Sequence, residues 1–227
     1  NAMRRGVKMA YIVENNGVYG LTKGQFSATA DRGSKSKKGV INSDSPIDLV
    51  GLALQLGATY VARAFSGDKE QLVPLIKGAI GHGGAAFIDV ISPCVAFNNH
   101  NGSTKSYDYV RQHNESVSRI DFMPQRSEIT AEYASGDVIE VEQHDGTFLR
   151  LRKVDTSYDP SKRYEALSYM NDHHERGEIV TGLLYLDPLA LDLHASLNTS
   201  HLPLNSMQEK ELCPGSVVLS KINESLR

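Results

Sequence analysis

Residues 85–91 read AAFIDVI, a run in which every residue but one is apolar. A short apolar run without polar alternation is typical of a strand that is covered on both faces, as in a parallel sheet. Two similar runs precede it, at Met9–Val13 and at Thr59–Ala64. Because the segments between the runs have helical spacing, the sequence predicts an α/β fold, a parallel sheet with flanking helices and right-handed crossovers.

Two helices are expected between these strands. The first begins with Ser45 as its N-cap and Pro46 at the first helical position, and it ends at Gly57. The second is capped by Ser66 and carries apolar residues at helical spacing as far as Ile80. Each helix is long enough to cover one face of a small sheet.

The second half of the chain shows a different pattern. Residues 138–142 and 148–152 alternate polar and apolar side chains around the tight-turn pair Asp145-Gly146, which predicts a half-exposed hairpin. A helix near Pro160–Glu175 and a strand at Ile179–Leu186 are expected to follow. This half is therefore interpreted as an α+β extension of the parallel sheet.

The domain organisation follows from this change of pattern. We expect an α/β domain at 3–118 and a C-terminal extension at 119–227, which closes with a helix over Val217–Leu226. Asn1 and Ala2, before Met3, are typical of a cloning scar.

Composition and charge exclude several functional classes. With 227 residues, 40% hydrophobic and 22% charged, the chain has ordinary globular composition. The formal net charge of −3 argues against nucleic acid as a partner. No segment approaches the ~20 apolar residues that cross a bilayer, so no membrane partner is expected. Two cysteines, too few for a disulfide framework, fit a reducing compartment, and we expect a cytoplasmic protein.

The segment directly after the first strand carries most of the functional signal. It reads ENNGVYGLTKGQ over residues 14–25. Open α/β sheets bind ligands at the carboxyl ends of their strands. An Asn side-chain oxygen and a backbone carbonyl two residues later can supply two ligands to Mg²⁺, and Gly17 and Gly20 allow a tight turn. From the residues alone, a polar turn that binds nothing remains an equal alternative.

Residues 15–25, continued by FSAT at 26–29, resemble the second half of the thiamine diphosphate motif in β subunits of 2-oxoacid:ferredoxin oxidoreductases. The segment IDVISPCVAFNNH at 88–100 resembles the same family. The resemblance covers roughly residues 3–120, and the remainder resembles the C-terminal extension of longer members. It implies the C-terminal half of a thiamine-diphosphate-binding fold.

The resemblance also implies roles for individual residues. Asn16 would give a side-chain oxygen to Mg²⁺ and Val18 its backbone carbonyl. Residues 22–25 would lie near the diphosphate or the substrate carboxylate. The full set of cofactor-binding residues that it implies is Asn15, Gly17, Tyr19, Gly20, Leu21, Thr22, Lys23, Gly24 and Gln25. It assigns no catalytic residue with certainty.

Two departures from the family pattern bear on these roles. The family motif opens with Gly-Asp-Gly, whose Asp is the charged ligand of Mg²⁺, and this sequence contains no Gly-Asp-Gly. Cys94 matches a cysteine that donates one ligand to a 4Fe–4S cluster, but such clusters need four cysteines and the other three are missing. We therefore expect a chain that lacks the N-terminal part of the subunit, binds the cofactor poorly and holds no cluster alone.

The function implied by the resemblance is that of a β subunit, or its C-terminal part. Such an enzyme oxidatively decarboxylates a 2-oxoacid to acyl-CoA and CO₂ and reduces ferredoxin. The long extension favours 2-oxoglutarate over pyruvate. The implied partners are an α subunit, ferredoxin, coenzyme A and the 2-oxoacid.

Two alternatives to this function remain open. The first is a non-catalytic remnant that only binds partners or self-associates. Gly-Asp-Gly and three cysteines in frame upstream of Met3 would favour the enzyme subunit, and a genuine start at Met3 would favour the remnant. The second is a non-oxidative thiamine diphosphate enzyme, which the likeness of Ser92-Pro93-Cys94 to the electron-transferring members disfavours.

A sheet that lacks its preceding strands also predicts self-association. Apolar strands need cover on both faces, and monomeric proteins rarely expose large apolar patches. We therefore expect the isolated chain to form a homodimer about a two-fold axis. The side chains expected to lose their cover are Tyr11, Val13, Phe87, Ile88 and Val90.

Overall fold

The computed structural model describes residues 1–117, 138–142, 148–152, 158–213 and 215–226. The chain forms two compact units, Asn1–Leu193 and His194–Arg227. The first contains the sheet and its helices, and the second contains the C-terminal helices. The predicted division at residue 118 stays a prediction, since it concerns the extent of the cofactor-binding fold.

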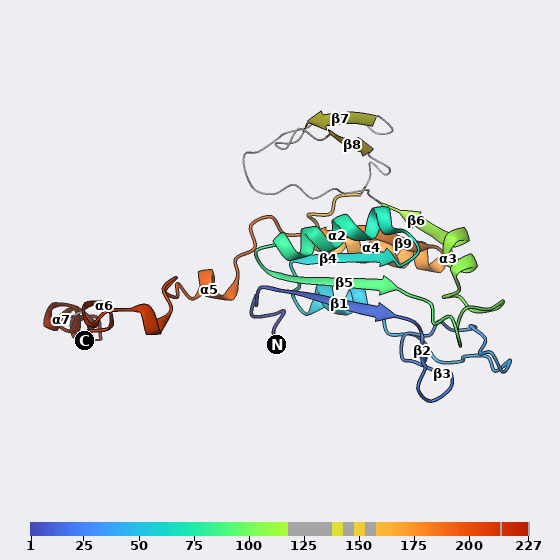
Figure 1. Ribbon diagram of the computed structural model, residues 1–227, viewed down its shortest axis with the longest axis horizontal. Coiled ribbons are helices and arrows are strands. Elements are labelled where there is room, and N and C mark those ends of the chain that lie inside the picture. The colour runs from blue at the N-terminus through green and yellow to red at the C-terminus, as the bar shows by residue number, and fades with distance from the viewer. Residues whose placement is uncertain (118–137, 143–147, 153–157, 214, 227) are drawn as a thin grey trace. The chain divides into compact units, whose positions relative to one another are not determined.

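The first unit is built around a five-stranded sheet with the order β1-β5-β4-β9-β6 (Figure 1). β1, β5 and β4 are parallel to one another, β9 is antiparallel to β4, and β6 is parallel to β9. The sheet is therefore mainly parallel, which confirms the predicted α/β fold, whereas the antiparallel β9 was not anticipated. The strands are β1 (Met9–Asn15), β4 (Tyr60–Phe65), β5 (Ala85–Ile91), β6 (Asn114–Ser116) and β9 (Ile179–Leu186).

Helices cover both faces of this sheet. Alternate side chains of β4 and β5 point to opposite faces, as the strand period of two requires. On one face Ala62 and Ile88 pack against α2 (Lys69–Gly81). On the other face Val61 and Phe87 pack against α1 (Leu49–Gln55) and α4 (Arg163–Glu175). Because of this cover, β5 is buried at all seven positions.

The starts of the first two helices differ from the prediction. Asp48, not Ser45, caps α1, and its carboxylate accepts two backbone N–H groups at 3.1 and 3.0 Å. Asp68, not Ser66, caps α2, and it accepts the N–H of Gln71 at 3.1 Å. A carboxylate cap also interacts favourably with the positive end of the helix, which a serine hydroxyl does not.

The sequence predicted five apolar side chains without cover in the sheet, and the structure confirms this only in part. Tyr11 of the edge strand β1 is 54% exposed and its neighbour Ile12 is 40% exposed, whereas Val13 is partly buried and packs against the core. Phe87, Ile88 and Val90, however, are buried. The prediction was wrong for these three because β5 is an interior strand, with β1 on one side, β4 on the other and helices on both faces.

The elements after the first domain agree with the predicted order. The hairpin of β7 (Val138–Glu142) and β8 (Phe148–Arg152) is antiparallel, while its Asp145-Gly146 turn lies outside the described residues. α4 begins at Arg163 rather than near Pro160. A short helix, α3 (Tyr107–His113), was not expected.

The second unit consists of short helices and connecting segments. The residues of this unit whose exposure the structure describes are exposed, except Met207, which is partly buried. No helix in the described part of the chain has both the length and the apolar character that a membrane span requires. The elements are α5 (Leu193–Ser196), which begins at the boundary, the 3-10 helix η1 (Leu204–Ser206), α6 (Glu209–Leu212) and α7 (Ser216–Ser225).

Candidate functional site

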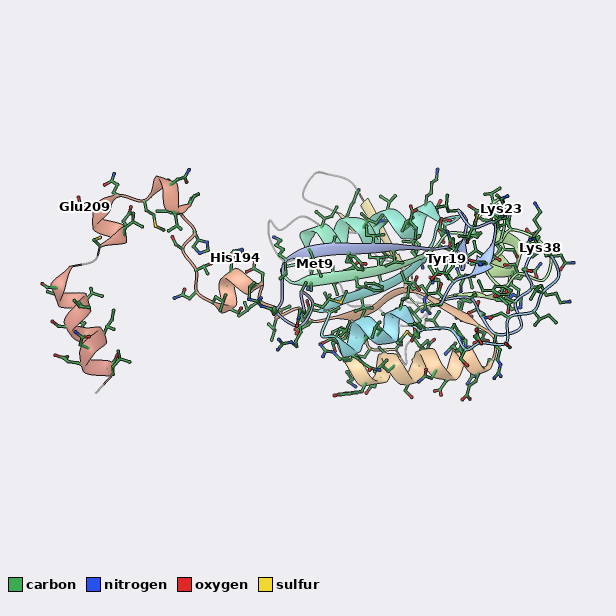
Figure 2. The ribbon with its side chains drawn as sticks, turned by 90° about the horizontal axis from the view of Figure 1, so that it is seen from below. Met9, Tyr19, Lys23, Lys38, His194 and Glu209 are labelled. Carbon is green, nitrogen blue, oxygen red and sulfur yellow. The ribbon has the colours of Figure 1, made fainter. Side chains whose placement is uncertain are left out.

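The three parallel strands end together at one edge of the sheet. Asn15 at the end of β1 and Phe65 at the end of β4 are both in register with Ile91 at the end of β5. The loops that follow these strands meet at this edge, where open α/β sheets bind their ligands. Tyr19 and Lys23 of the loop after β1 lie just beyond that strand (Figure 2).

The loop after β1 folds into a short hairpin of β2 (Val18–Tyr19) and β3 (Gln25–Phe26). It is entered through a turn in which the Val18 N–H donates to Asn16 Oδ1 at 3.0 Å. Gly17 has φ +71°, a conformation in which glycine carries no steric cost. The turn is closed by the Ser27 N–H, which donates to the Gly17 carbonyl at 3.0 Å.

The tip of this hairpin presents its side chains outward. Leu21 is 99% exposed and Tyr19 is 55% exposed. Thr22 Oγ1 donates to the Tyr19 carbonyl at 3.2 Å, and Lys23 adopts φ +69°, uncommon for a residue with a side chain. Gly24, at φ +95°, lies against the Phe97 ring. Most of the predicted cofactor-binding residues therefore form one exposed hairpin.

Asn15 differs from the other predicted residues because its side chain is buried. Its Nδ2 donates to Asp89 Oδ1 at 3.1 Å, and its Oδ1 accepts from Thr29 Oγ1 at 2.7 Å. Its backbone carbonyl accepts the N–H of Ser92 at 3.0 Å. Asn15 thus fastens the hairpin to the sheet.

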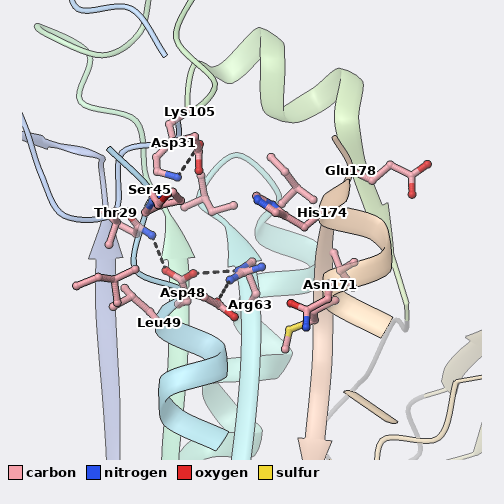
Figure 3. A pocket seen from close by; sticks show the side chains of 18 of the residues that line it. Thr29, Asp31, Ser45, Asp48, Leu49, Arg63, Lys105, Asn171, His174 and Glu178 are labelled. Carbon is pink, nitrogen blue, oxygen red and sulfur yellow. Dashed lines mark hydrogen bonds and ion pairs between the residues drawn. The ribbon is translucent and has the colours of Figure 1, made fainter. Parts of the chain in front are cut away.

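A pocket of about 410 Å³ opens at the same edge, on the face covered by α1 and α4 (Figure 3). Its walls come from the ends of β1, β4 and β5, from the loop before α1, and from the last turn of α4 and the start of β9. The polar residues that line it are Asn15, Thr29, Asp31, Arg32, Ser45, Asp48, Arg63, Asp89, Lys105, Asn171, His174 and Glu178.

Arg63 lies at the centre of this pocket's charge network. Its Nε is 2.9 Å from Asp89 Oδ2 and its Nη2 is 3.0 Å from Asp48 Oδ1. Burial by itself lowers the pKa of Arg63, but the charges and hydrogen bonds of Asp89 and Asp48 outweigh burial and raise this pKa. The guanidinium therefore stays charged and joins β4, β5 and the start of α1.

A second ion pair lies at the rim. Lys105 Nζ is 3.1 Å from Asp31 Oδ2, which also accepts from Thr104 Oγ1 at 2.6 Å. These contacts tie the loop after β5 to the loop after β1.

The network of Asp48, Arg63 and Asp89 was missed by sequence reasoning. A signal for it was present, because Arg63 and Asp89 are the charged residues of two otherwise apolar strands. They are register partners in the parallel pair of β4 and β5, so their side chains lie on one face. Only the pairing of β4 with β5 shows that Arg63 and Asp89 lie side by side.

The donors at the turn fit Mg²⁺ in part. Asn16 Oδ1 and the Val18 carbonyl are oxygens of the type that this ion prefers, but neither carries charge. Within the described ranges, no group of three or more His, Cys, Asp or Glu side chains is arranged to hold a metal ion. The turn alone therefore lacks the charged ligand that a magnesium site commonly includes.

Cys94 lies at intermediate exposure in the loop after β5, and Cys213 belongs to the second unit. One thiolate does not hold a 4Fe–4S cluster, which takes four cysteine ligands. The cluster therefore does not fit this chain alone.

Comparison with known proteins shows what this chain is similar to. Residues 1–90 match the thiamine pyrophosphate enzyme, C-terminal TPP binding domain. The β subunit of 2-oxoacid:ferredoxin oxidoreductase from Saccharolobus solfataricus is 48% identical over 110 residues, which cover 47% of this chain and 35% of that subunit. The chain is a relative of these oxidoreductase β subunits.

Two further proteins are similar to this chain. The 2-oxoglutarate synthase subunit KorB of Methanocaldococcus jannaschii is 33% identical over 144 residues, which cover 62% of this chain and 53% of that subunit. A solved 2-oxoglutarate:ferredoxin oxidoreductase from Magnetococcus marinus, with 2-oxoglutarate, coenzyme A and succinyl-CoA bound, superposes with a TM-score of 0.61 at 25% identity. That alignment covers 93% of this chain and 58% of the solved chain. The chain thus spans about a third to a half of the curated β subunits named here.

Proposed function

We propose that this chain is part of the β subunit of a thiamine-diphosphate-dependent 2-oxoacid:ferredoxin oxidoreductase. Its reaction is the oxidative decarboxylation of a 2-oxoacid, with 2-oxoglutarate favoured and pyruvate as the other candidate, to acyl-CoA and CO₂ with reduction of ferredoxin. The observation that carries the proposal is the hairpin after β1, which occupies the ligand-binding edge and lies inside the segment that matches the cofactor-binding family.

The residues of this hairpin would bind and orient the cofactor. Thiamine diphosphate, when bound, supplies the carbanion chemistry, and the protein positions it. Asn16 Oδ1 and the Val18 carbonyl would hold part of the Mg²⁺ shell. The ammonium of Lys23 would offset the negative charge of the diphosphate or of the substrate carboxylate.

The exposure of the hairpin supports a site that a second chain completes. Leu21 and Tyr19 are too exposed to enclose a ligand by themselves, and desolvation of a reacting group needs cover. An α subunit is the partner that would provide this cover. Coenzyme A is present in the Magnetococcus marinus relative and is proposed here as the acyl acceptor.

Cys94 is proposed to supply one ligand of the 4Fe–4S cluster, together with three cysteines from outside this chain. Ferredoxin would be the electron acceptor. The cytoplasmic location also remains part of the proposal.

The test compares the isolated chain with the complete enzyme. The chain alone should decarboxylate no 2-oxoacid and contain no iron, since it lacks the carboxylate ligand and three of the cysteines. The complete β subunit with its α subunit should reduce a dye acceptor in a reaction that needs 2-oxoglutarate and coenzyme A. Turnover or four iron atoms per isolated chain would contradict the first expectation, and an inactive complete complex would contradict the function.

The alternative function is a non-catalytic module that binds partners or pairs with itself. The outer edge of β1, which pairs with no described strand and carries the exposed Tyr11 and Ile12, favours it, because an open strand edge accepts another strand. We propose that the isolated chain forms a homodimer through this edge. Sedimentation at micromolar concentration should show a dimer that Ile12→Lys disrupts, and a 24.9 kDa monomer would refute the pairing.

A further inference from the structure

Asn98, in the loop after β5, is a buried polar residue that touches the predicted magnesium turn. It is only 3% exposed. Its Nδ2 donates to the backbone carbonyl of Asn16 at 2.7 Å. Its Oδ1 accepts from Ser103 Oγ at 2.7 Å, and this second bond orients the amide. The side chain therefore presents a donor, in a fixed direction, to the peptide that precedes Gly17.

The backbone of Asn98 makes a second connection. Its N–H donates to the Cys94 carbonyl at 2.7 Å, and the N–H of Phe97 donates to the same carbonyl at 3.2 Å. Asn98 thus closes the turn that begins at Cys94 while its side chain holds the turn that begins at Asn16. One residue bridges two loops that follow different strands.

The packing around Gly17 shows how close this contact is. A Cβ at Gly17 would lie 2.8 Å from Asn98 Nδ2 and 2.9 Å from Lys105 Cδ. Ser103 also accepts the backbone N–H of Lys105 through its hydroxyl, at 3.2 Å. The Asn16 turn therefore rests directly on a surface that Asn98, Ser103 and Lys105 build.

We propose that Asn98 is a positioning residue that fixes the turn at Asn16–Val18 and couples it to the turn at Cys94. It does not touch a ligand itself. A change at either turn is transmitted to the other through the Asn98 amide. One consequence rests on the proposed function. The turn that would bind Mg²⁺ and the turn that carries the cluster cysteine would each respond, through Asn98, to a change in the other.

The experiment uses amide hydrogen exchange, followed by NMR on the full chain. The reporters are the N–H groups of Val18 and Ser27 at one turn and of Phe97 at the other, since each makes a backbone or turn hydrogen bond. All variants carry Cys213→Ser, so that iodoacetamide modifies Cys94 alone. Asn98→Asp keeps the shape and the Ser103 bond but removes the donor to Asn16. Asn101→Asp, an exposed residue of the same loop, is the matched control.

Asn98→Asp should raise the amide exchange rates of Val18 and Ser27 by about tenfold, because one buried hydrogen bond is lost. Exchange in β4 should stay unchanged, whereas a general loss of stability would raise it equally. Carboxamidomethylation of Cys94 should change the exchange of Val18 and Ser27 in the parent and leave it unchanged in Asn98→Asp. Unaltered exchange at Val18 and Ser27 in Asn98→Asp, or an equal rise in β4, would overturn the proposal.

Ser103→Ala provides a second variant if Asn98→Asp does not fold. It removes the hydroxyl that orients the amide, together with the acceptor of the Lys105 N–H, and it should raise the same rates severalfold; no change would count against the coupling. The proposed function is tested separately, by calorimetric measurement of thiamine diphosphate binding to the complete complex in the presence of Mg²⁺. Absence of binding there with the exchange pattern intact would refute the function and leave the role of Asn98 standing.

Discussion

The two halves of the site are held in place by different forces. The hairpin at residues 16–26 is exposed, and backbone hydrogen bonds and glycines determine its shape. In the network of Asp48, Arg63 and Asp89, the Asp89 and Arg63 side chains are 3% and 17% exposed while Asp48 is 47% exposed, and side-chain ion pairs between distant segments determine its geometry. The difference predicts that substitutions in the network act on stability, while, under the proposed function, substitutions of the exposed hairpin side chains act mainly on cofactor binding.

The largest effect is expected from Arg63→Met. Asp89, whose side chain is 3% exposed, would then be a buried carboxylate without its cationic partner. Breaking one partner of a buried pair typically costs about 3–5 kcal/mol. Because the Arg63 side chain is 17% exposed, we expect the lower end, about 3 kcal/mol, measured by urea unfolding.

The control for this prediction is Arg176→Met at the exposed end of α4. It should change the free energy of unfolding by less than about 0.5 kcal/mol. Equal effects of the two substitutions would show that the network adds no stability.

The next effect is expected from Gly17→Ala, where the hairpin meets its support. The added Cβ would approach Asn98 Nδ2 within 2.8 Å at a φ of +71°. Strain of this kind costs about 1–3 kcal/mol. Gly33→Ala is the matched control, since Gly33 has φ +84° and nothing within 4 Å of its Cβ position. If both variants lose the same stability, the contact with Asn98 contributes nothing beyond the backbone conformation.

The contrast between the halves also explains how much could be predicted from the sequence. The strands at Met9, Thr59, Ala85 and Ile179 were predicted within a few residues, because their apolar runs are local signals. The segment after β1 was singled out by its motif, which is equally local, although its hairpin was not predicted. Asp89 could be seen as a charge in a buried strand, but its partners became visible only once β4 paired with β5.

Other errors have the same origin. Ser45 and Ser66 looked like caps because serine caps helices well, yet aspartates two or three residues later do so here. The bond from Asn98 to Asn16 spans 82 residues, and no local pattern reports it. Local chemistry could thus be predicted, whereas pairings between distant segments could not.

Asn16→Ala tests the hairpin side of the contrast. In the complete enzyme it should weaken Mg²⁺-dependent binding of thiamine diphosphate about tenfold, since one of few protein oxygens on the metal is lost. Urea unfolding of the chain should change by only about 1 kcal/mol, the worth of the bond from the Val18 N–H. Asn101→Ala is the control for both measurements. Unchanged calorimetric affinity in Asn16→Ala would mean that Asn16 is a turn residue only.

The smallest effect is expected away from the site, at His82, which precedes β5. Its Nε2 lies 2.8 Å from Thr59 Oγ1. Burial lowers the pKa of His82, and the nearby charge of Asp187 opposes this only in part. On acidification the unfolded chain therefore takes up a proton, near its ordinary pKa of about 6.5, before the folded chain does. The stability that His82 contributes is present above about pH 6.5 and declines below it.

His82→Gln should remove this contribution, because an amide can bond Thr59 but does not titrate. The difference in unfolding midpoint between the parent and His82→Gln should shrink as the pH falls from about 7.5 to about 5.5. His201→Gln, at an exposed position of the second unit, is the control variant. A constant difference for His82→Gln would mean that its proton affinity is the same in the folded and unfolded chain. Sensitivity to acid would then have to arise from other groups, with the packing of His82 against Tyr60 contributing equally at every pH.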